Sequence, residues 1–324
     1  MAIQAPTRAR YVVLSIWLLL ALFPWIADAV GQAYWINILT RALILGLVAM
    51  SLNLIMGYGG MVSLGHAAYF GVGGYSVALI AFHVAQAIPI FGWAGSNEAL
   101  VVWPIAMLLT GWLALVLGAL CLRTQGVYFI MITLAFCQML FFIVISLKYY
   151  GGDDGLIMSQ RNLLAGRPLN DPAALYYVCF VVLLAAFLVL SKITASSFGL
   201  ALQASKINPR RALALGIPVK RVQLTAFVIA GVLAGLGGAL WVNQMRIASP
   251  DMLNWIRSGE LIMMVILGGL GSHMGAIVGA IALVVLETWL AGMTEHWMLL
   301  LGAILVLTVL FIKKGLFVRL AGRV

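Results

Sequence analysis

Charge is scarce in this sequence. Charged residues make up 9% of its 324 residues, whereas soluble proteins ordinarily contain about 25%. The chain therefore lacks the polar residues that would cover a soluble core. Because hydrophobic residues make up 64% of the chain and its mean hydropathy is +1.12, the composition predicts an all-α polytopic membrane protein.

Cysteine and catalytic motifs are also scarce. The three cysteines, Cys121, Cys137 and Cys179, lie within apolar segments, and their odd number and spacing exclude a disulfide framework. The sequence contains no HExxH, no GxxxxGK phosphate loop, no Cys and His set with metal spacing and no nucleophile elbow. We therefore expect neither an enzyme nor a bound metal or cofactor.

The apolar residues are grouped in runs long enough to cross a membrane. One crossing needs about 20 mostly apolar residues, and ten segments approach this length, although the eighth is short. We expect transmembrane or re-entrant helices at 11–27, 35–56, 62–83, 99–122, 126–147, 173–192, 223–245, 260–270, 274–292 and 296–312.

The first of these segments also has features of a cleavable signal peptide. Arg8 and Arg10 precede the apolar run, and Ala27-Asp28-Ala29 resembles a cleavage site. A first transmembrane helix accounts for the same residues and completes the set of ten. The helix is therefore the favoured interpretation.

The distribution of charge predicts the topology, because Lys and Arg are enriched in cytoplasmic loops. With the N-terminus inside, the basic residues in cytoplasmic segments are Arg8, Arg10, Arg123, Lys192, Lys206, Arg210, Arg211, Lys220, Arg221, Lys313, Lys314, Arg319 and Arg323. The opposite side receives Asp28, Glu98, Asp153, Asp154, Asp171, Asp251 and Glu295. We therefore expect both termini in the cytoplasm, and interpret the net charge of +10 as topology and not as nucleic-acid binding.

Five basic residues depart from this trend: Lys148, Arg161, Arg167, Arg246 and Arg257. The longest outer loop, about 148–172, is too short to form a core of its own. We expect a single transmembrane domain, 1–324, with one long polar cytoplasmic loop at 193–222.

Two glycine-rich stretches, 57–71 and 268–279, interrupt the apolar segments. At a constant offset they share a Gly-Gly pair, Ser63 with Ser272, and Ala67 with Ala276, which weakly indicates an internal repeat. Both also carry small residues at every fourth position, as does the run Gly231, Gly235, Ala239. Such runs allow helices to pack closely. Alternatively, interrupted helices with exposed backbone groups line a water-filled path.

Few ionisable residues lie within the apolar segments: Arg41, His66, His83, Glu260, His273 and Glu287. His66 and His273 each fall in a glycine-rich stretch, where a histidine is either a hydrogen-bonded packing element or part of a path. Ion-coupled transporters usually need carboxylates near the middle of the membrane, and neither glutamate is clearly central. If the protein moves a solute, we expect the energy to come from elsewhere.

The polar stretch 196–221 contains five basic residues and no acidic one. Asn208 suits the N-cap, Pro209 the first helical position and Gly216 the position after a helix end, while Pro218 prevents continuation. We predict a short capped helix at 209–215. It lies either on the cytoplasmic membrane surface or in the groove of a partner protein.

Several separated motifs, taken together, resemble a known family. They are SLNLIMGYGGMVSLGHAAYFGVGGY, AFVIAGVLAGLGGAL, SPDMLNWIRSGELIMMVILGGLGSHMGAIVGA and TEHWMLLLGAILVLTVLFIKKGL. They look like the LivM-type permease of branched-chain amino-acid ABC importers, over about 37–316. The resemblance implies a permease subunit of the bacterial inner membrane without catalysis of its own. Its implied partners are a LivH-like second permease, two cytoplasmic ATPase subunits that bind the ATP, and a periplasmic amino-acid binding protein.

The resemblance also implies roles for particular residues. The capped helix is similar to the coupling helix that docks into the ATPase, which implicates Asn208, Pro209, Arg210, Arg211, Ala212 and Gly216. Many relatives carry an acidic residue and an Ala-Ala pair there, whereas this chain has arginines. Our candidates for the translocation path are Ser63, His66, Tyr69, Gly269, Ser272 and His273.

Other functions remain open at this point. Members of the same family handle urea, short-chain amides, aromatic amino acids and other small zwitterions. A self-contained secondary transporter or channel would need no partner, and a membrane-embedded enzyme is disfavoured by the absent catalytic motifs.

Overall fold

The ten predicted segments all correspond to helices in the computed structural model, which describes residues 7–29, 31–32, 34–89, 92–311 and 315–321. The long helices are α1 (Thr7–Ala29), α2 (Tyr34–Asn53), α3 (His66–Ala85), α4 (Ala99–Cys121), α5 (Val127–Ser146), α6 (Pro172–Ala195), α9 (Val219–Met245) and α11 (His273–Ala291). The shorter helices are α7 (Ser197–Ile207), α8 (Pro209–Ala214), α10 (Trp255–Gly268), α12 (Trp297–Phe311) and α13 (Leu316–Ala321). Among the described residues, 8 helices are long and apolar enough to cross a membrane.

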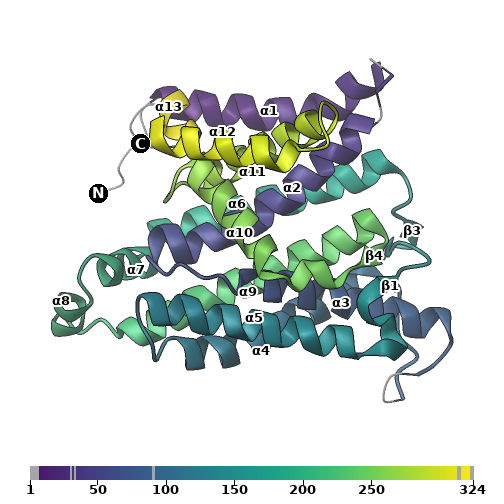
Figure 1. The fold of residues 1–324 in the computed structure, drawn as a ribbon, viewed down its shortest axis with the longest axis horizontal. Coiled ribbons are helices and arrows are strands. Elements are labelled where there is room, and N and C mark those ends of the chain that lie inside the picture. The colour runs from purple at the N-terminus through teal and green to yellow at the C-terminus, as the bar shows by residue number, and fades with distance from the viewer. Residues whose placement is uncertain (1–6, 30, 33, 90–91, 312–314, 322–324) are drawn as a thin grey trace.

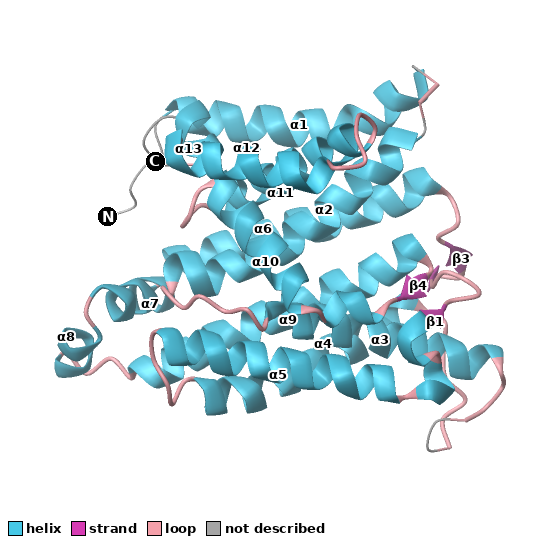
Figure 2. Ribbon diagram, in the orientation of Figure 1, coloured by secondary structure: helices cyan, strands magenta, loops and turns pink. Residues whose placement is uncertain are grey.

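The polar connections gather at two opposite ends of the helix bundle. Helices α7, α8 and α13 and the start of α1 lie at one end (Figure 1). At the other end lie the short strands β1 (Leu156–Ile157), β2 (Leu163–Leu164), β3 (Arg167–Pro168) and β4 (Ile247–Ala248) (Figure 2). Strand β1 pairs with β4 and β2 with β3, both antiparallel.

The start of α1 and helix α13 lie at the same end as α7 and α8, which is the arrangement that the predicted topology requires (Figure 1). Three of the residues behind that prediction, Lys313, Lys314 and Arg323, lie outside the described residues. The side chains of Arg8 and Asp28 also lie outside them. The cytoplasmic location of this end stays a prediction.

Helix α2 is the most enclosed of the candidate spans. It continues into a turn of π-helix, η1 (Leu54–Tyr58), and 94% of the apolar window over Tyr34–Tyr58 is buried within the chain. Helices α6, α9, α10 and α11 all pack against it. By contrast, the apolar windows of α1 and α5 are only 22% and 17% buried, so most of their apolar surface is free to face lipid or another subunit.

Helix α1 contains Pro24, and hydrogen bonds near this residue fix the helix to the bundle. Proline has no N–H, so the carbonyl four residues earlier, that of Leu20, loses its usual helical partner. The hydroxyl of Tyr176 on α6 donates to this oxygen at 2.6 Å, and Tyr177 donates to the carbonyl of Ala21 at 3.4 Å. Lipid tails offer no donor, so these hydrogen bonds must come from within the protein.

The loop 148–172 is held by buried polar contacts, and its buried apolar residues Leu156, Met158 and Leu169 belong to the main core. Arg161 donates to the carbonyls of Leu169 and Asn170, both at 3.0 Å. Asn162 and Asn243 exchange two hydrogen bonds, of 2.7 and 2.9 Å, that join the loop to α9. Burial, together with the positive charge of Arg246, lowers the pKa of Arg161. Arg161 is an exception to the predicted distribution of basic residues between the two sides of the membrane, and its role is to hold this loop together.

The small-residue runs are sites of close helix packing, as the first of the two interpretations held. A Cβ added to Gly235 on α9 would overlap the side chain of Thr110 on α4, and one on Gly238 would overlap the carbonyl oxygen of Phe70 on α3. A Cβ on Gly279 of α11 would overlap the carbonyl of Met264 on α10. Backbones approach here more closely than any larger residue permits.

The structure moves several of the predicted boundaries. Segment 62–83 begins as irregular backbone, and α3 starts only at His66, since the glycine-rich residues before it form a turn. Helix α9 begins at Val219 and not at 223, and α10 at Trp255 and not at 260. The polar loop at 193–222 also contains α7, which the sequence did not predict because only Ser196 separates it from α6 and no glycine marks its end.

Replacing Gly238 by alanine is expected to destabilise the bundle. The new methyl group would force α3 and α9 apart, and overpacking of this kind costs about 1–3 kcal/mol. The melting temperature of the purified protein in detergent would measure the loss. Gly302→Ala on α12 is the control, because a Cβ there meets no atom within 4 Å and alanine favours a helix. Equal melting temperatures for Gly238→Ala and the wild type would contradict the close packing.

Candidate functional site

The two glycine-rich stretches meet at the end of α2. Asn53, a fully buried residue, accepts a hydrogen bond at 3.0 Å from the backbone N–H of Gly271 through its side-chain oxygen. The rings of Tyr58 and His273 stack with centroids 4.8 Å apart. The structure thus brings together segments that are more than 200 residues apart in the chain.

The first group of path candidates surrounds the start of α3. Nε2 of His66 lies 2.8 Å from the hydroxyl of Ser51 on α2. The hydroxyl of Ser63 accepts the N–H of Gly65, and that of Ser258 on α10 accepts the N–H of Ala67. These serines satisfy backbone groups that the glycine turn and the first turn of α3 leave without helical partners.

Tyr69 lies one turn further along α3. Its ring meets the ring of His66 edge-on, with centroids 6.0 Å apart. Tyr69 also borders a cavity of about 10 Å³, which is far too small for an amino acid.

The second group of path candidates surrounds the start of α11. Gly269 has a φ of 118°, which residues with a side chain rarely adopt. Ser272 is the N-cap of α11 and accepts the N–H of Gly275 at 3.1 Å. Nε2 of His273 lies 3.3 Å from the hydroxyl of Thr194 on α6. The two histidines therefore have different partners and belong to separate polar groups.

The path candidates are closed off from solvent in this conformation. Ser63, His66, Tyr69, Gly269 and His273 are buried, and Ser272 is half-buried. In both histidines Nδ1 is buried without a hydrogen-bond partner among the described residues. Their role in a path stays a prediction, and the unpaired nitrogens are the feature most in keeping with it, because buried polar atoms are normally paired.

The predicted capped helix is present as α8. The side chain of Asn208 accepts the N–H of Arg211 at 3.0 Å, which is the predicted N-cap. At the other end Gly216 has a φ of 82°, and the N–H of Ile217 donates to the carbonyl of Ala212 at 3.0 Å, which closes a Schellman motif. Ala212 is buried, whereas Pro209, Arg210 and Arg211 point to solvent.

One hydrogen bond links this polar segment to the first glycine-rich stretch. The ammonium of Lys206, at the end of α7, donates to the carbonyl of Gly57 at 2.6 Å. A cavity of about 800 Å³ lies beside this contact and is lined by residues of both segments, including Gly60, Val62, Pro209, Leu213 and Arg221. Movement of α7 and α8 would therefore displace the backbone of the first glycine-rich stretch at Gly57.

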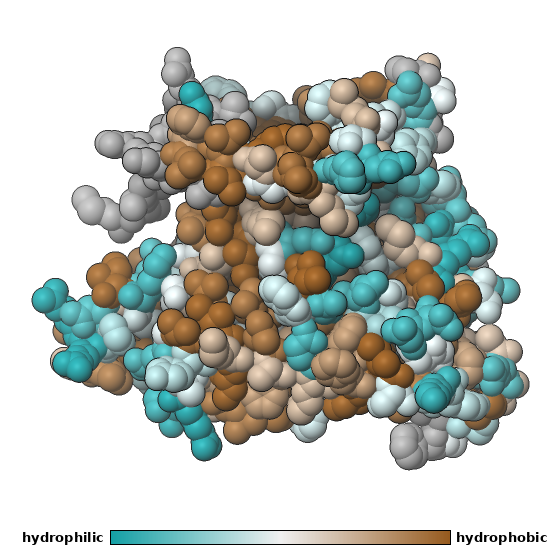
Figure 3. Space-filling model, in the orientation of Figure 1, coloured by the Kyte–Doolittle hydropathy of each residue, from teal (hydrophilic) through white to brown (hydrophobic). Residues whose placement is uncertain are grey.

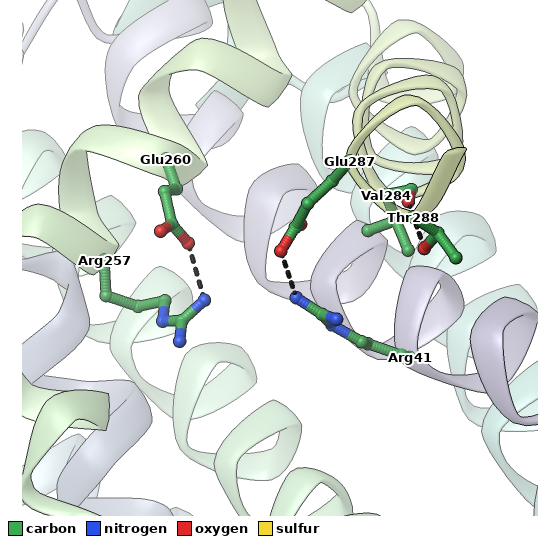
Figure 4. Close-up of polar contacts among 6 residues, drawn as sticks. All are labelled: Arg41, Arg257, Glu260, Val284, Glu287 and Thr288. Carbon is green, nitrogen blue, oxygen red and sulfur yellow. Dashed lines mark hydrogen bonds and ion pairs between the residues drawn. The ribbon is translucent and has the colours of Figure 1, made fainter. Parts of the chain in front are cut away.

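A cluster of four charged side chains is the feature that sequence reasoning missed. Arg41 on α2 pairs with Glu287 on α11 at 2.9 Å, and Arg257 pairs with Glu260 on α10 at 2.6 Å. Figure 4 shows the two pairs facing one another. Both guanidinium groups also lie over the ring of Trp241 on α9, 5.8 and 5.7 Å from its centroid. We call these four residues the charged quartet.

The charged quartet lies among apolar helices, where charged side chains are rare and normally face the interior of the bundle or water. An ion pair three residues apart on one helix contributes only about 0.2–0.5 kcal/mol. The face drawn in Figure 3 has hydrophilic side chains in its middle, between two largely apolar regions. Arg41, Glu260 and Glu287 were visible in the sequence as intramembrane charges, but nothing there showed their pairing.

Comparison with known proteins points to one family. A family model described as "Branched-chain amino acid transport system / permease component" matches residues 34–309. The high-affinity branched-chain amino acid transport system permease protein LivM of Escherichia coli (strain K12) is 25% identical over 305 residues, 87% of this chain and 69% of the relative. The LivM protein of Salmonella typhimurium matches to the same extent. A probable LivH permease of Methanocaldococcus jannaschii is 32% identical over 108 residues, 32% of this chain and 31% of the relative. No solved structure matches the chain.

Replacing Asn53 by alanine is expected to loosen the junction of the two glycine-rich stretches. The N–H of Gly271 would lose its partner in a part-buried hydrogen bond, and a typical intramolecular hydrogen bond contributes about 0.5–1.5 kcal/mol. The melting temperature in detergent would report the loss. Asn37→Ala, at an exposed position on the same helix, should change stability by less than about 0.5 kcal/mol. Equal losses for the two variants would mean that the contact with Gly271 stabilises nothing.

Proposed function

The chain belongs to the family of permease components of branched-chain amino acid transport systems, and we propose that it is the permease subunit of a bacterial ABC importer. It moves branched-chain or related amino acids into the cytoplasm, with ATP hydrolysed by partner subunits. The observation that carries the proposal is the extent of the family match, which runs from the start of α2 to near the end of α12.

The proposed partners are those of the complete importer. They are a second, LivH-like permease, two cytoplasmic ATPase subunits and a periplasmic binding protein that delivers the amino acid. The multi-pass chain would lie in the bacterial inner membrane, with α7 and α8 on the cytoplasmic side. The weakly buried spans α1 and α5 leave apolar surface for lipid or the second permease.

Helix α8 is the proposed docking element for an ATPase subunit. It projects from the bundle together with α7 (Figure 1), and its exposed side chains combine charge with apolar surface. Ile207, Leu213 and Leu215 are 84%, 58% and 75% exposed, beside the exposed Arg210 and Arg211. Apolar side chains at the tip of a projecting helix favour a groove in a partner protein over bare solvent.

The hydrogen bonds described above suggest how docking would be transmitted. A shift of α8 would move α7, and the hydrogen bond from Lys206 would then displace the carbonyl of Gly57. From there η1 leads back to Asn53, which holds Gly271 in the second glycine-rich stretch. In the open conformation the six path candidates would then border the solute, to which a conduit offers only transient polar contacts.

Co-purification provides the first test. Extracted from native membranes in mild detergent, the chain should carry along a second permease and a P-loop ATPase, identified by peptide mass. Reconstituted in liposomes, the complex should transport amino acids only when the binding protein is on one side of the membrane and ATP is on the other side, where the ATPase subunits lie. A chain that purifies alone and accumulates solute under an ion gradient would instead be a secondary transporter.

Reversing the charge of Arg211 is expected to uncouple the importer. If Arg211 meets a carboxylate of the ATPase, Arg211→Glu replaces an attraction by repulsion, which should lower amino-acid uptake at least tenfold while the chain still inserts. Uptake and ATP hydrolysis by the reconstituted complex would be measured together. Lys192→Glu is the matched control, because Lys192 is an exposed basic residue at the end of α6, just before this segment. Unchanged uptake by Arg211→Glu would exclude the contact.

A further inference from the structure

We propose that the charged quartet is a transit site that binds the ammonium and carboxylate groups of a zwitterionic amino acid. This inference rests on the proposed function and deepens it, because it assigns the charged ends of the solute to particular side chains. It adds a site separate from the two histidine groups. The observations behind it are the pairing, the exposure and the neighbours of Arg41, Arg257, Glu260 and Glu287.

Glu260 is the member of the charged quartet that packing between helices does not explain. Its carboxylate pairs at 2.6 Å with Arg257, three residues earlier on the same helix. Arg257 itself lies over Trp241 on α9, and the pair of Arg41 with Glu287 joins α2 to α11. A purely structural explanation therefore covers three of the four residues and leaves Glu260 without a helix-joining contact among the described residues.

The four side chains remain within reach of a solute. Their exposed fractions are 27% for Arg41, 22% for Glu287, 22% for Arg257 and 36% for Glu260. Charged groups in membrane segments face water or other protein and avoid lipid. The charged quartet thus holds both signs of charge side by side at partly exposed positions (Figure 4).

The charges of the quartet match those of an amino acid. A guanidinium presents several N–H donors that fit a carboxylate, and a carboxylate accepts hydrogen bonds from an ammonium. Because the quartet has two positive and two negative groups, a zwitterion leaves the site neutral, whereas a simple cation or anion adds net charge. A zwitterion would exchange existing ion pairs for equivalent ones, so binding would be weak and release easy, as a conduit requires.

The position of the site connects it to the path candidates. Ser258, the neighbour of Arg257, accepts the backbone N–H of Ala67 at the start of α3. Helix α10 then runs from the charged quartet to Gly268, where the second glycine-rich stretch begins. Trp241 lies against both guanidinium groups and fixes them on one side. A solute leaving the quartet would therefore stand next to His66 and its group.

Cysteine substitution at Met263 tests the site in the complete importer and leaves the four charged residues in place. Met263 lies one turn from Glu260 on α10 and is 44% exposed, whereas the wild-type Cys121, Cys137 and Cys179 are buried, so within this chain a thiol reagent should label Met263→Cys selectively. We expect saturating L-leucine to slow labelling by a charged methanethiosulfonate at least fivefold. The amide 4-methylpentanamide, which has a similar carbon skeleton but neither charge, should not protect. Protection by both compounds, or by neither, would overturn the proposal.

Uptake of radiolabelled L-leucine by the same reconstituted complex gives a second measurement. Glu260→Gln and Arg257→Gln should lower it at least tenfold while assembly and ATP hydrolysis persist, since the ion pair between them lies within one helix. The controls are Glu295→Gln and Arg167→Gln, which remove the same charges at exposed positions away from the quartet. Wild-type uptake by both quartet variants would overturn the transit site and leave the proposed function intact. If the wild-type complex itself imports no amino acid with ATP, the proposed function fails.

Discussion

Backbone polar groups inside an apolar bundle must find partners within the protein, and this constraint explains most of the buried polar residues described here. The glycine-rich stretches break two helices at positions where lipid offers no hydrogen bond. Asn53 and Ser258 supply partners to Gly271 and Ala67, and Ser63 and Ser272 bond to the turns that contain them. Each of these side chains therefore lowers the cost of an interruption in an apolar environment.

The polar contacts form a connected series through the molecule. It begins at the charged quartet, passes through Ser258 to the start of α3, and reaches the end of α2 at Ser51 and Asn53. The bond from Lys206 to Gly57 then joins it to the projecting helices. The features proposed for solute transit and for coupling are thus close to one another along a few helices, where α3 packs closely against α9, and α10 against α2 and α11.

The sequence was sufficient wherever the determining interaction is local. Segment length located the ten helices, and Asn208, Pro209 and Gly216 located α8, because capping depends on residues only a few positions apart. The sequence did not predict contacts between distant residues. Arg41 and Glu287 are separated by 246 positions, and no local pattern in the sequence indicates that they pair. The histidines show the same limit. Both were recognised as unusual from their glycine-rich surroundings, but their separate partners, Ser51 and Thr194, depend on how α2 and α6 pack.

The hydrogen bond between Tyr176 and Leu20 has a consequence for the order of assembly. Donor and acceptor are 156 residues apart, and chains are synthesised at about 5–20 residues per second, so α6 follows α1 by roughly 8–30 seconds. During this interval the carbonyl freed by Pro24 has no partner from the finished protein. Water or a local change of helix geometry can satisfy this carbonyl while α1 enters the bilayer alone. Its partner in the finished protein arrives only with α6, so the contact that fixes the first helix to the bundle is made after most of the chain has been synthesised.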